Sequence, residues 1–474
     1  MAITASTNTA FDVTTLVSQL MAVERRPIER LNTLISDTQA KISSLGTLSS
    51  LVSTFQGAAF GLRMSMEKLT ATASDTNAMV ASAGIAAVPG SYAVQVNQLA
   101  RAQNLVAAGQ ASSTAAIGDG SPTTLTFDFG TISGGTLSNG IYAGASFTPG
   151  SGGSASVTID GSNNSLQGIR DAINAAKIGV TATIVNDGSG TPFRLALTST
   201  NTGETSSMRI SVAGGDGTLA NLLAYDPAGA QNLTQTQAAQ NASLTVNGIG
   251  ITSASNTVKD AIQGVTLTLR STTATPATLN VARDTAAMTT AATSFVDAYN
   301  ALYSQLKSRS AYATDGKAAG VLAGDSALRL MQEQLRNIFL TPATGGTLNS
   351  LSQIGIAFQR EGVLAFDSAK FASAMTTDFA DVANLIGSPS GFATRLEQWG
   401  SATLSADGPI QSRTKSLNDY VKDRNAEIDR LELRLAAIEK RYKTEYTNLN
   451  LLLGRMNTTS TFLTQQLATS QKND

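Results

Sequence analysis

A heptad repeat of apolar side chains near the C-terminus is the feature that most constrains the fold of this chain. One apolar residue recurs at every seventh position, and these residues, here called the C-terminal stripe, are Val421, Ile428, Leu435, Tyr442, Leu449, Met456 and Leu463. A second phase holds Leu417, Leu431, Ile438 and Leu452. Apolar residues at this spacing share one face of a helix, and that face must pack against a partner to leave water. We expect a helix over about residues 411–467, roughly 80 Å long at ~1.5 Å per residue.

The N-terminal region carries a matching pattern. Its apolar residues fall on two phases that are three and four residues apart: Val17, Leu20, Leu31, Leu34, Leu45, Leu48, Val52 and Phe55. Pro27 lies in a gap of this pattern, and a proline breaks a helix or begins a new one, so we expect two helical pieces that meet near it. We expect Val17, Leu20, Leu31 and Leu34 to pack against the C-terminal stripe. The alternative is that each stripe residue belongs to the core of its own domain.

Composition excludes several kinds of chemistry. The chain has no Cys and no His, so it has no disulfides, no thiolate nucleophile and no histidine-based catalysis or metal ligation. Its formal net charge of −1 gives no general attraction to nucleic acid. Asp160, Asp171 and Asp187 lack the spacing of a calcium loop. The stretch GVLAGDSALR lacks the Gly-Lys-Ser/Thr ending of a phosphate loop. We expect no enzyme activity, no cofactor and no metal.

Membrane insertion is also not expected. No stretch approaches the roughly 20 apolar residues that a membrane helix needs. The first residues, MAITASTNTAFDV, lack a basic start and an apolar h-region. We therefore expect no cleavable signal peptide, so that export would need another route.

The middle of the chain, from about residue 71 to 281, is predicted to be antiparallel sheet exposed on one face. Short alternating runs such as SYAVQVNQL and GVTLTLR are separated by Gly, Asn and Pro turn signals. The Gly-rich stretch 131–154 is predicted to be a mobile loop or a hairpin. One helix is expected in NNSLQGIRDAINAA, with Asn164 or Ser165 as the N-cap and with Leu166, Ile169 and Ile173 on one face. A similar stretch, 255–269, predicts a second unit of a short helix followed by a strand.

Helices are expected again from about residue 283. Asp325 or Ser326 is expected to cap one helix, a hairpin is expected to turn at Glu361–Gly362, and Asp367 is expected to cap the next helix. Glu439 and Lys443 form a favourable i,i+4 pair on the terminal helix. The predicted fold class is α+β and multidomain, with long helical, coiled-coil termini and helix-rich segments bracketing β-rich domains.

Several stretches resemble the flagellar filament cap proteins, the hook-associated protein 2 family. They are VPGSYAVQVNQLARAQ (88–103), SLQGIRDAINAAKIGVTATIVNDGSGTPFRLALTSTNTG (165–203), NASLTVNGIGITSASNTVKDAIQGVTLTL (241–269), FVDAYNALYSQL (295–306), GVLAGDSALRLMQEQLR (320–336), IGIAFQREGVLAFD (354–367) and LELRLAAIEKRYKTEYTNLNLLLGRMNTTSTFLTQQL (431–467). The family usually begins with a Gly-Leu-Ser-Gly-Leu-Asp type of segment. Here the match to that segment begins only at Asp12, so the resemblance does not extend to the first ten residues.

The resemblance implies a domain organisation. It consists of an N-terminal coil helix (1–40), a helix-rich leg domain (41–75 and 284–410), an inner β-rich head domain (76–105 and 240–283), an outer β-rich head domain (106–239) and a C-terminal coil helix (411–474).

The resemblance also implies a structural protein that is secreted to the filament tip. Such subunits form a ring, with a pentamer favoured and a hexamer possible, whose head domains make a plate and whose legs reach the filament. The expected partners are other copies of the chain, flagellin that folds and inserts beneath the plate, the hook–filament junction protein before the filament grows, and a cytosolic export chaperone at the C-terminal helix. The alternatives are another flagellar axial protein, namely a junction subunit or a flagellin, and a secreted surface adhesin.

The coil residues have an expected role in this scheme. The C-terminal stripe is expected to form an assembly seam with Val17, Leu20, Leu31 and Leu34, with helical ends that are loose in the free chain and ordered in the assembly. Arg424 and Glu445 lie on the second phase, where they either face solvent or pair across chains to set the register. We expect Leu435→Glu to abolish cap assembly and a fragment of about residues 75–405 to stay folded.

Overall fold

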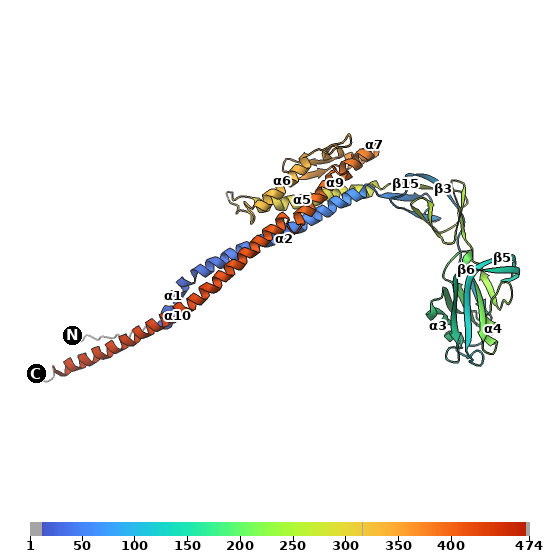
Figure 1. Ribbon diagram of the computed structural model, residues 1–474, viewed down its shortest axis with the longest axis horizontal. Helices are drawn as coiled ribbons and strands as arrows, with labels where there is room; N and C mark the ends of the chain where they lie inside the picture. The colour runs from blue at the N-terminus through green and yellow to red at the C-terminus, as the bar shows by residue number, and fades with distance from the viewer. Residues whose placement is uncertain (1–11, 315, 471–474) are drawn as a thin grey trace. The chain divides into compact units, whose positions relative to one another are not determined.

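A computed structural model describes residues 12–314 and 316–470 of the chain. It divides into two compact units, one formed by the residues up to 66 together with those from 285 onward, and one formed by residues 67–284 (Figure 1). The first unit is mostly helical and the second is mostly strand, which confirms the predicted α+β class with helical termini around a β-rich middle. Among the described residues, none of the helices combines the length and the apolar character that a membrane span requires.

The helical unit is built from two groups of elements along the sequence. The first group is α1 (Val13–Glu24) and α2 (Arg26–Ser65), and the second is α5 (Thr285–Ser310), α6 (Ser326–Leu340), the hairpin β16 (Ile356–Phe358) and β17 (Leu364–Phe366), α7 (Ser368–Thr377), α8 (Phe379–Gly387), α9 (Phe392–Leu404) and α10 (Pro409–Ser470), with a short 3₁₀ turn at Leu351–Ile354. Figure 1 shows α10 running beside α2, and the two helices contact each other.

Pro27 accounts for the break between α1 and α2. The first helix ends at Glu24, and the second begins at Arg26 with the proline in its first turn, where its missing N–H costs nothing. Asp12 caps α1 by accepting hydrogen bonds from the backbone N–H groups of Thr14 and Thr15. The prediction of two helical pieces is confirmed. The second piece continues past Phe55, the last residue of the N-terminal pattern, and ends at Ser65.

The core of the helical unit is built around Phe55 of α2. Its ring centroid lies 5.3 Å from that of Phe295, 5.8 Å from that of Tyr299 and 6.4 Å from that of Trp399. The same core includes other buried residues of α2, namely Leu45, Leu48, Val52 and Leu62. A fragment of residues 75–405 would lack all of them. Folding of the whole fragment stays a prediction, and we expect its helical part to be destabilised because α5 and α9 would lose these core partners.

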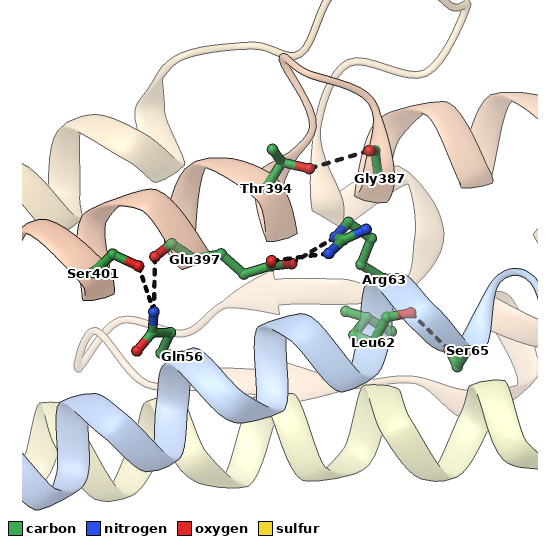
Figure 2. A network of polar contacts seen from close by, with 8 residues as sticks. All are labelled: Gln56, Leu62, Arg63, Ser65, Gly387, Thr394, Glu397 and Ser401. Atoms are coloured by element: carbon green, nitrogen blue, oxygen red, sulfur yellow. Dashed lines mark hydrogen bonds and ion pairs between the residues drawn. The ribbon is translucent and has the colours of Figure 1, made fainter.

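Polar contacts fix α2 against α9 (Figure 2). Arg63 makes a two-pronged contact with Glu397, with Nε 2.7 Å from Oε1 and an Nη atom 3.1 Å from Oε2. Gln56 donates to the Glu397 carbonyl at 3.2 Å and to the Ser401 hydroxyl at 2.7 Å. The paired fork of arginine and carboxylate fixes the relative rotation of the two helices as well as their distance.

Capping predictions in this unit are also confirmed. The Asp325 carboxylate accepts from the N–H of Ala327 at the start of α6, and Asp367 accepts from Ala369 and Lys370 at the start of α7. The short hairpin of β16 and β17 lies between α6 and α7 in the sequence, and its turn contains Gly362 at φ +85°. Lys443 lies 2.7 Å from Glu439, as the i,i+4 spacing predicts.

The β-rich unit contains four antiparallel sheets, with strand orders β1-β15-β3-β11-β12, β10-β4-β8-β7, β13-β14-β2 and β6-β5-β9. Its strands are β1 (Leu69–Ala73), β2 (Met79–Ala83), β3 (Gly90–Gln98), β4 (Asn104–Ala107), β5 (Thr123–Ser138), β6 (Ile141–Ile159), β7 (Val180–Asn186), β8 (Phe193–Ser199), β9 (Ser207–Gly214), β10 (Leu233–Gln237), β11 (Ala242–Val246), β12 (Ile249–Ser253), β13 (Thr257–Ile262), β14 (Val265–Leu269) and β15 (Ala277–Arg283). Its helices are α3 (Leu166–Ala176) and α4 (Thr218–Leu223), with a 3₁₀ turn at Glu204–Ser206.

Two separate apolar cores lie in this unit. One is formed by strands near both sequence ends of the unit and includes Val94, Leu244 and Leu267. The other is formed by the segments between them and includes Phe127, Ile169 and Tyr225. Helix α3 belongs to the second core. Its predicted N-cap is Ser165, whose hydroxyl accepts from the N–H of Gly168.

The Gly-rich stretch 131–154 is a hairpin, one of the two predicted alternatives. Strands β5 and β6 pair along most of their length and turn at Asn139–Gly140, which have φ of 51° and 80°. The tip is held by Gln231, whose amide both accepts from the Tyr142 N–H at 2.7 Å and donates to the Tyr142 carbonyl at 2.9 Å. Gly140 also accepts from the Gln235 N–H at 2.8 Å. Glycine supplies the positive φ that this turn requires.

The predicted helix in 255–269 is wrong, because Thr257–Ile262 is strand β13, paired with β14. Its buried apolar residues, Val258 and Ile262, are four apart, and this spacing puts two residues on one face of either a helix or a strand. In α3, by contrast, Leu166 and Ile169 are three apart, which only a helix brings together. The apolar spacing in 255–269 therefore does not distinguish a helix from a strand. The segment is a strand because it pairs with β14.

The limits given above for the coil, leg and head domains stay predictions. Helix α2 runs without interruption across residues 40 and 41, where the N-terminal coil was expected to give way to the leg domain. Residues 1–11 of the expected N-terminal coil and 471–474 of the expected C-terminal coil lie outside the described residues.

Candidate assembly surface

Helix α1 packs against the middle of α10. Val17 and Met21 are 2% and 5% exposed and form a small apolar cluster with Leu435, which is 9% exposed. Half-buried residues surround this cluster: Val13, Ile28, Ile438, Tyr442 and Tyr446. The heptad patterns predicted that the N-terminal helix packs against the C-terminal stripe. Around Leu435 this packing is present within one chain.

Charged groups border the cluster. The Tyr442 hydroxyl donates to the Glu24 carboxylate at 3.4 Å. Lys443, which is hydrogen-bonded to Glu439, holds the pKa of that carboxyl below its usual value, and Arg25 adds a smaller effect. A cavity of about 370 Å³ lies between α2 and α10 here, lined by Ile28 and Asn32 on one side and by Leu435 and Glu439 on the other.

The predicted stripe residues divide into two groups. Leu435 is buried, and Val421, Ile428 and Tyr442 are half-buried. The three residues farther along α10 are exposed, Leu449 by 42%, Met456 by 60% and Leu463 by 55%, and so is Leu452 of the second phase, by 54%. We call these four residues the distal stripe. Within the described part of the chain the distal stripe belongs to no apolar core.

On the N-terminal side the structure corrects one residue. Val17 and Leu31 are buried and Leu20 is half-buried, but Leu34 is 44% exposed. Ile35, which is 8% exposed, faces inward in place of Leu34. Whether the predicted residues form a seam between copies stays a prediction.

Sequence reasoning missed Met21 and Ile35, although a signal was present. Leu31, Ile35, Thr38, Ile42 and Leu45 alternate four and three apart and join the buried residues farther along α2. A stripe drawn through Leu34 breaks this alternation. The predicted inward position is therefore displaced by one residue, which is a rotation of about 100° around the helix axis.

Arg424 and Glu445 both find partners in their own helix. Arg424 lies 2.6 Å from Glu427 and 5.1 Å from the centroid of the Tyr420 ring. Glu445 is 3.8 Å from Arg441. Such exposed or half-exposed pairs contribute little to stability.

The three aspartates considered for calcium have separate local partners. Asp160 accepts from the Ser162 hydroxyl, which holds the pKa of its carboxyl below the usual value. Asp171 pairs with Arg170, and Asp187 pairs with Arg194. Across the residues that the structure describes, no three acidic side chains are grouped as metal ligands would be.

The comparisons with known proteins agree with one another. The model of the flagellar hook-associated protein 2 N-terminus matches residues 9–103, and that of its C-terminus matches residues 239–458. Flagellar hook-associated protein 2 of Escherichia coli K12 is 33% identical over 472 residues, which is 96% of each chain. The B-type protein of Pseudomonas aeruginosa is 31% identical, again over 96% of each chain. The crystal structure of the D1-D2-D3 domains of the flagellar cap protein from Escherichia coli is 33% identical, covers 79% of this chain and 99% of that one, and superposes with a TM-score of 0.67.

The helical unit with paired chain ends, the β-rich unit and these likenesses define a flagellar cap protein, a structural component of a filament. More specifically, the chain belongs to the flagellar hook-associated protein 2 family, so the resemblance noted from the sequence is confirmed.

Proposed function

We propose that the chain is a subunit of the cap at the distal tip of a bacterial flagellar filament, outside the cell. Its copies form a ring, with five favoured over six, in which the β-rich heads make a plate and the helical parts form legs. The cap promotes folding and insertion of exported flagellin. The observation that carries this proposal is the distal stripe, an apolar face on a long helix that its own chain leaves in water.

The distal stripe needs an apolar partner. Full burial of one such side chain is worth about 1.5–3 kcal/mol, and since roughly half of each one is exposed, covering it yields about 1 kcal/mol per residue. Four residues then supply a few kcal/mol, enough to favour association without making it irreversible. Other copies of α10 and the filament end are the occupants we assign to this face.

This weak apolar face fits a cap that must move. Incoming flagellin has to displace the legs repeatedly, so the leg contacts must form and break. We infer that the distal part of α10 is loose in the free subunit and ordered in the assembly. The same helix is the proposed site for a cytosolic export chaperone, and the hook–filament junction protein is the proposed neighbour before the filament grows.

The test is a paired set of substitutions on α10. Met456→Glu with Leu463→Glu places two negative charges on the distal stripe, whereas Thr458→Glu places one negative charge on the opposite side of the helix. We expect the double variant to lose the ring in mass photometry and to give short filaments, while Thr458→Glu assembles like the parent chain. A double variant that forms rings and caps filaments normally would contradict the proposal that the distal stripe drives assembly.

Labelling the chain on intact filaments separates the alternative functions. A cap labels only the tip, a junction protein only the base, and a flagellin the whole length. A deletion strain that swims normally and adheres poorly would instead identify an adhesin.

A further inference from the structure

A cavity of about 480 Å³ lies in the helical unit, away from the coil. Helix α5 lines it with Tyr299 and Lys307, helix α6 with Arg336 and Phe339, and the β16–β17 hairpin with Phe358 and Arg360. This volume is within the range of about 300–1,000 Å³ that is usual for ligand sites. We call it the leg pocket.

The floor of the leg pocket is aromatic and rigidly held. The ring centroid of Tyr299 lies 5.2 Å from that of Phe339 and 5.8 Å from that of Phe358, and the latter two are 5.1 Å apart. The hydroxyls of Tyr299 and Tyr303 donate to the carbonyls of Gly362 and Glu361 at 3.1 and 2.8 Å. These bonds tie the hairpin to α5, so the floor is preformed.

The rim of the leg pocket is cationic. Lys307, Arg336 and Arg360 are exposed, one from each of the three elements, and no Asp or Glu is among the lining residues. In the described ranges none of the three cations has an ion pair. The hydroxyl of Tyr299 is neutral at neutral pH and does not offset them, and burial, with a smaller effect from Tyr303, raises its pKa further.

Apolar surface continues from the floor out to the mouth. Leu340 is 71% exposed and Phe358 is 48% exposed. A small molecule inside the cavity would leave Leu340 in water, whereas a polypeptide crossing the mouth would cover it. Aromatic anchors surrounded by complementary charge are typical of peptide-binding sites.

We propose that the leg pocket is a docking site for an acidic segment of a partner polypeptide, which inserts an aliphatic or aromatic side chain between Tyr299, Phe339 and Phe358. Carboxylates that flank the inserted side chain pair with Lys307, Arg336 and Arg360. The site uses neither the distal stripe nor α1, so it is independent of the proposed assembly through α10.

The probe is a fluorescein-labelled synthetic helix of about 15 residues, near the length at which an isolated helix becomes marginally stable. It carries two leucines four positions apart, flanked by glutamates, and a matched peptide carries glutamines in place of the glutamates. Fluorescence anisotropy with the full chain measures binding. We expect the acidic peptide to bind at least about 10-fold more tightly than the neutral one, with a difference that shrinks at high salt.

Substitutions locate the site. Arg336→Glu should weaken binding of the acidic peptide by about 5-fold or more. Phe358→Ala should weaken binding of both the acidic and the neutral peptide. Arg329→Glu is the matched control, because Arg329 is an exposed cation on the same helix that does not line the pocket. It should leave both affinities unchanged, and circular dichroism checks that every variant is folded.

Three results would overturn the proposal. They are an acidic peptide that does not bind or binds no better than the neutral one, equal losses for Arg336→Glu and Arg329→Glu, and displacement of the peptide by free benzoate at a concentration equal to that of the peptide. The last result would identify a site for small aromatic acids instead of a polypeptide.

Discussion

The carboxylate of Asp325 joins two helices, because its Oδ2 atom lies 2.8 Å from Nε of Arg413 on α10 while its Oδ1 atom accepts from the N–H of Ala327 on α6. The Asp325 side chain is only 4% exposed and that of Arg413 is 35% exposed. One residue thus caps α6 and fixes the first turns of α10 beside it.

These two roles of Asp325 can be separated. Asp325→Asn keeps a side chain that caps a helix nearly as well, but it removes the charge that Arg413 requires. Asp325→Ala removes both. We expect the free energy of unfolding of the helical unit to fall by about 1 kcal/mol for the asparagine variant and by about 2 kcal/mol for the alanine variant. Urea titration followed by circular dichroism at the helix band measures this, and equal losses would contradict the double role.

Leu435 and Leu433 provide a matched pair on α10. Leu435 is 9% exposed against Val17 and Met21, whereas Leu433 is 75% exposed. Leu435→Glu should place a charge in the apolar cluster and release α1, so that amides of residues 13–24 exchange faster with deuterium. Leu433→Glu should leave that exchange as it is. Protection of α1 that survives Leu435→Glu would show that the cluster does not hold this helix.

Two glycines test what holds the tip of the β5–β6 hairpin. Gly140 and Gly144 both have positive φ, at +80° and +74°, so alanine at either position should cost about 1–2 kcal/mol of backbone strain. A Cβ at position 140 would also lie 2.4 Å from Cγ2 of Thr234, while one at position 144 would meet nothing within 4 Å. We expect Gly140→Ala to lower the thermal midpoint more than Gly144→Ala and to expose the tip amides to exchange. Equal shifts would mean that the contact with β10 is dispensable.

The pair of Asp187 and Arg194 gives an acid-sensitive contribution. The hydrogen bond from Arg194 holds the pKa of the Asp187 carboxyl well below its usual range, with smaller effects from Ser189. A carboxyl whose pKa is lowered by folding stabilises the folded state above its unfolded pKa, and this contribution is lost as the pH falls through the lower, folded value. Arg194→Gln should therefore raise the pKa of Asp187 in a carboxyl NMR titration. An unchanged pKa in that variant would show that the pair does not form in solution.

How far the sequence predicts this protein depends on whether a signal is local. The α1–α2 break at Pro27, the caps at Ser165, Asp325 and Asp367, and the long terminal helix follow from the residues themselves, because proline geometry, capping and heptad spacing act within a few residues. The strand at Thr257–Ile262 did not follow, because its apolar spacing fits both regular structures and only pairing with β14 selects one.

The helical ends, the β-rich middle and the membership of the hook-associated protein 2 family can be read from the residues alone, since periodicity and short motifs are recognisable without any knowledge of contacts. Contacts between distant segments decide that Ile35 and not Leu34 turns inward, that Leu435 is covered while Met456 is not, and that three separate segments meet in the leg pocket. The physical reason is that burial depends on which distant element is available to cover a side chain, and the spacing of residues along one helix contains no information about that element.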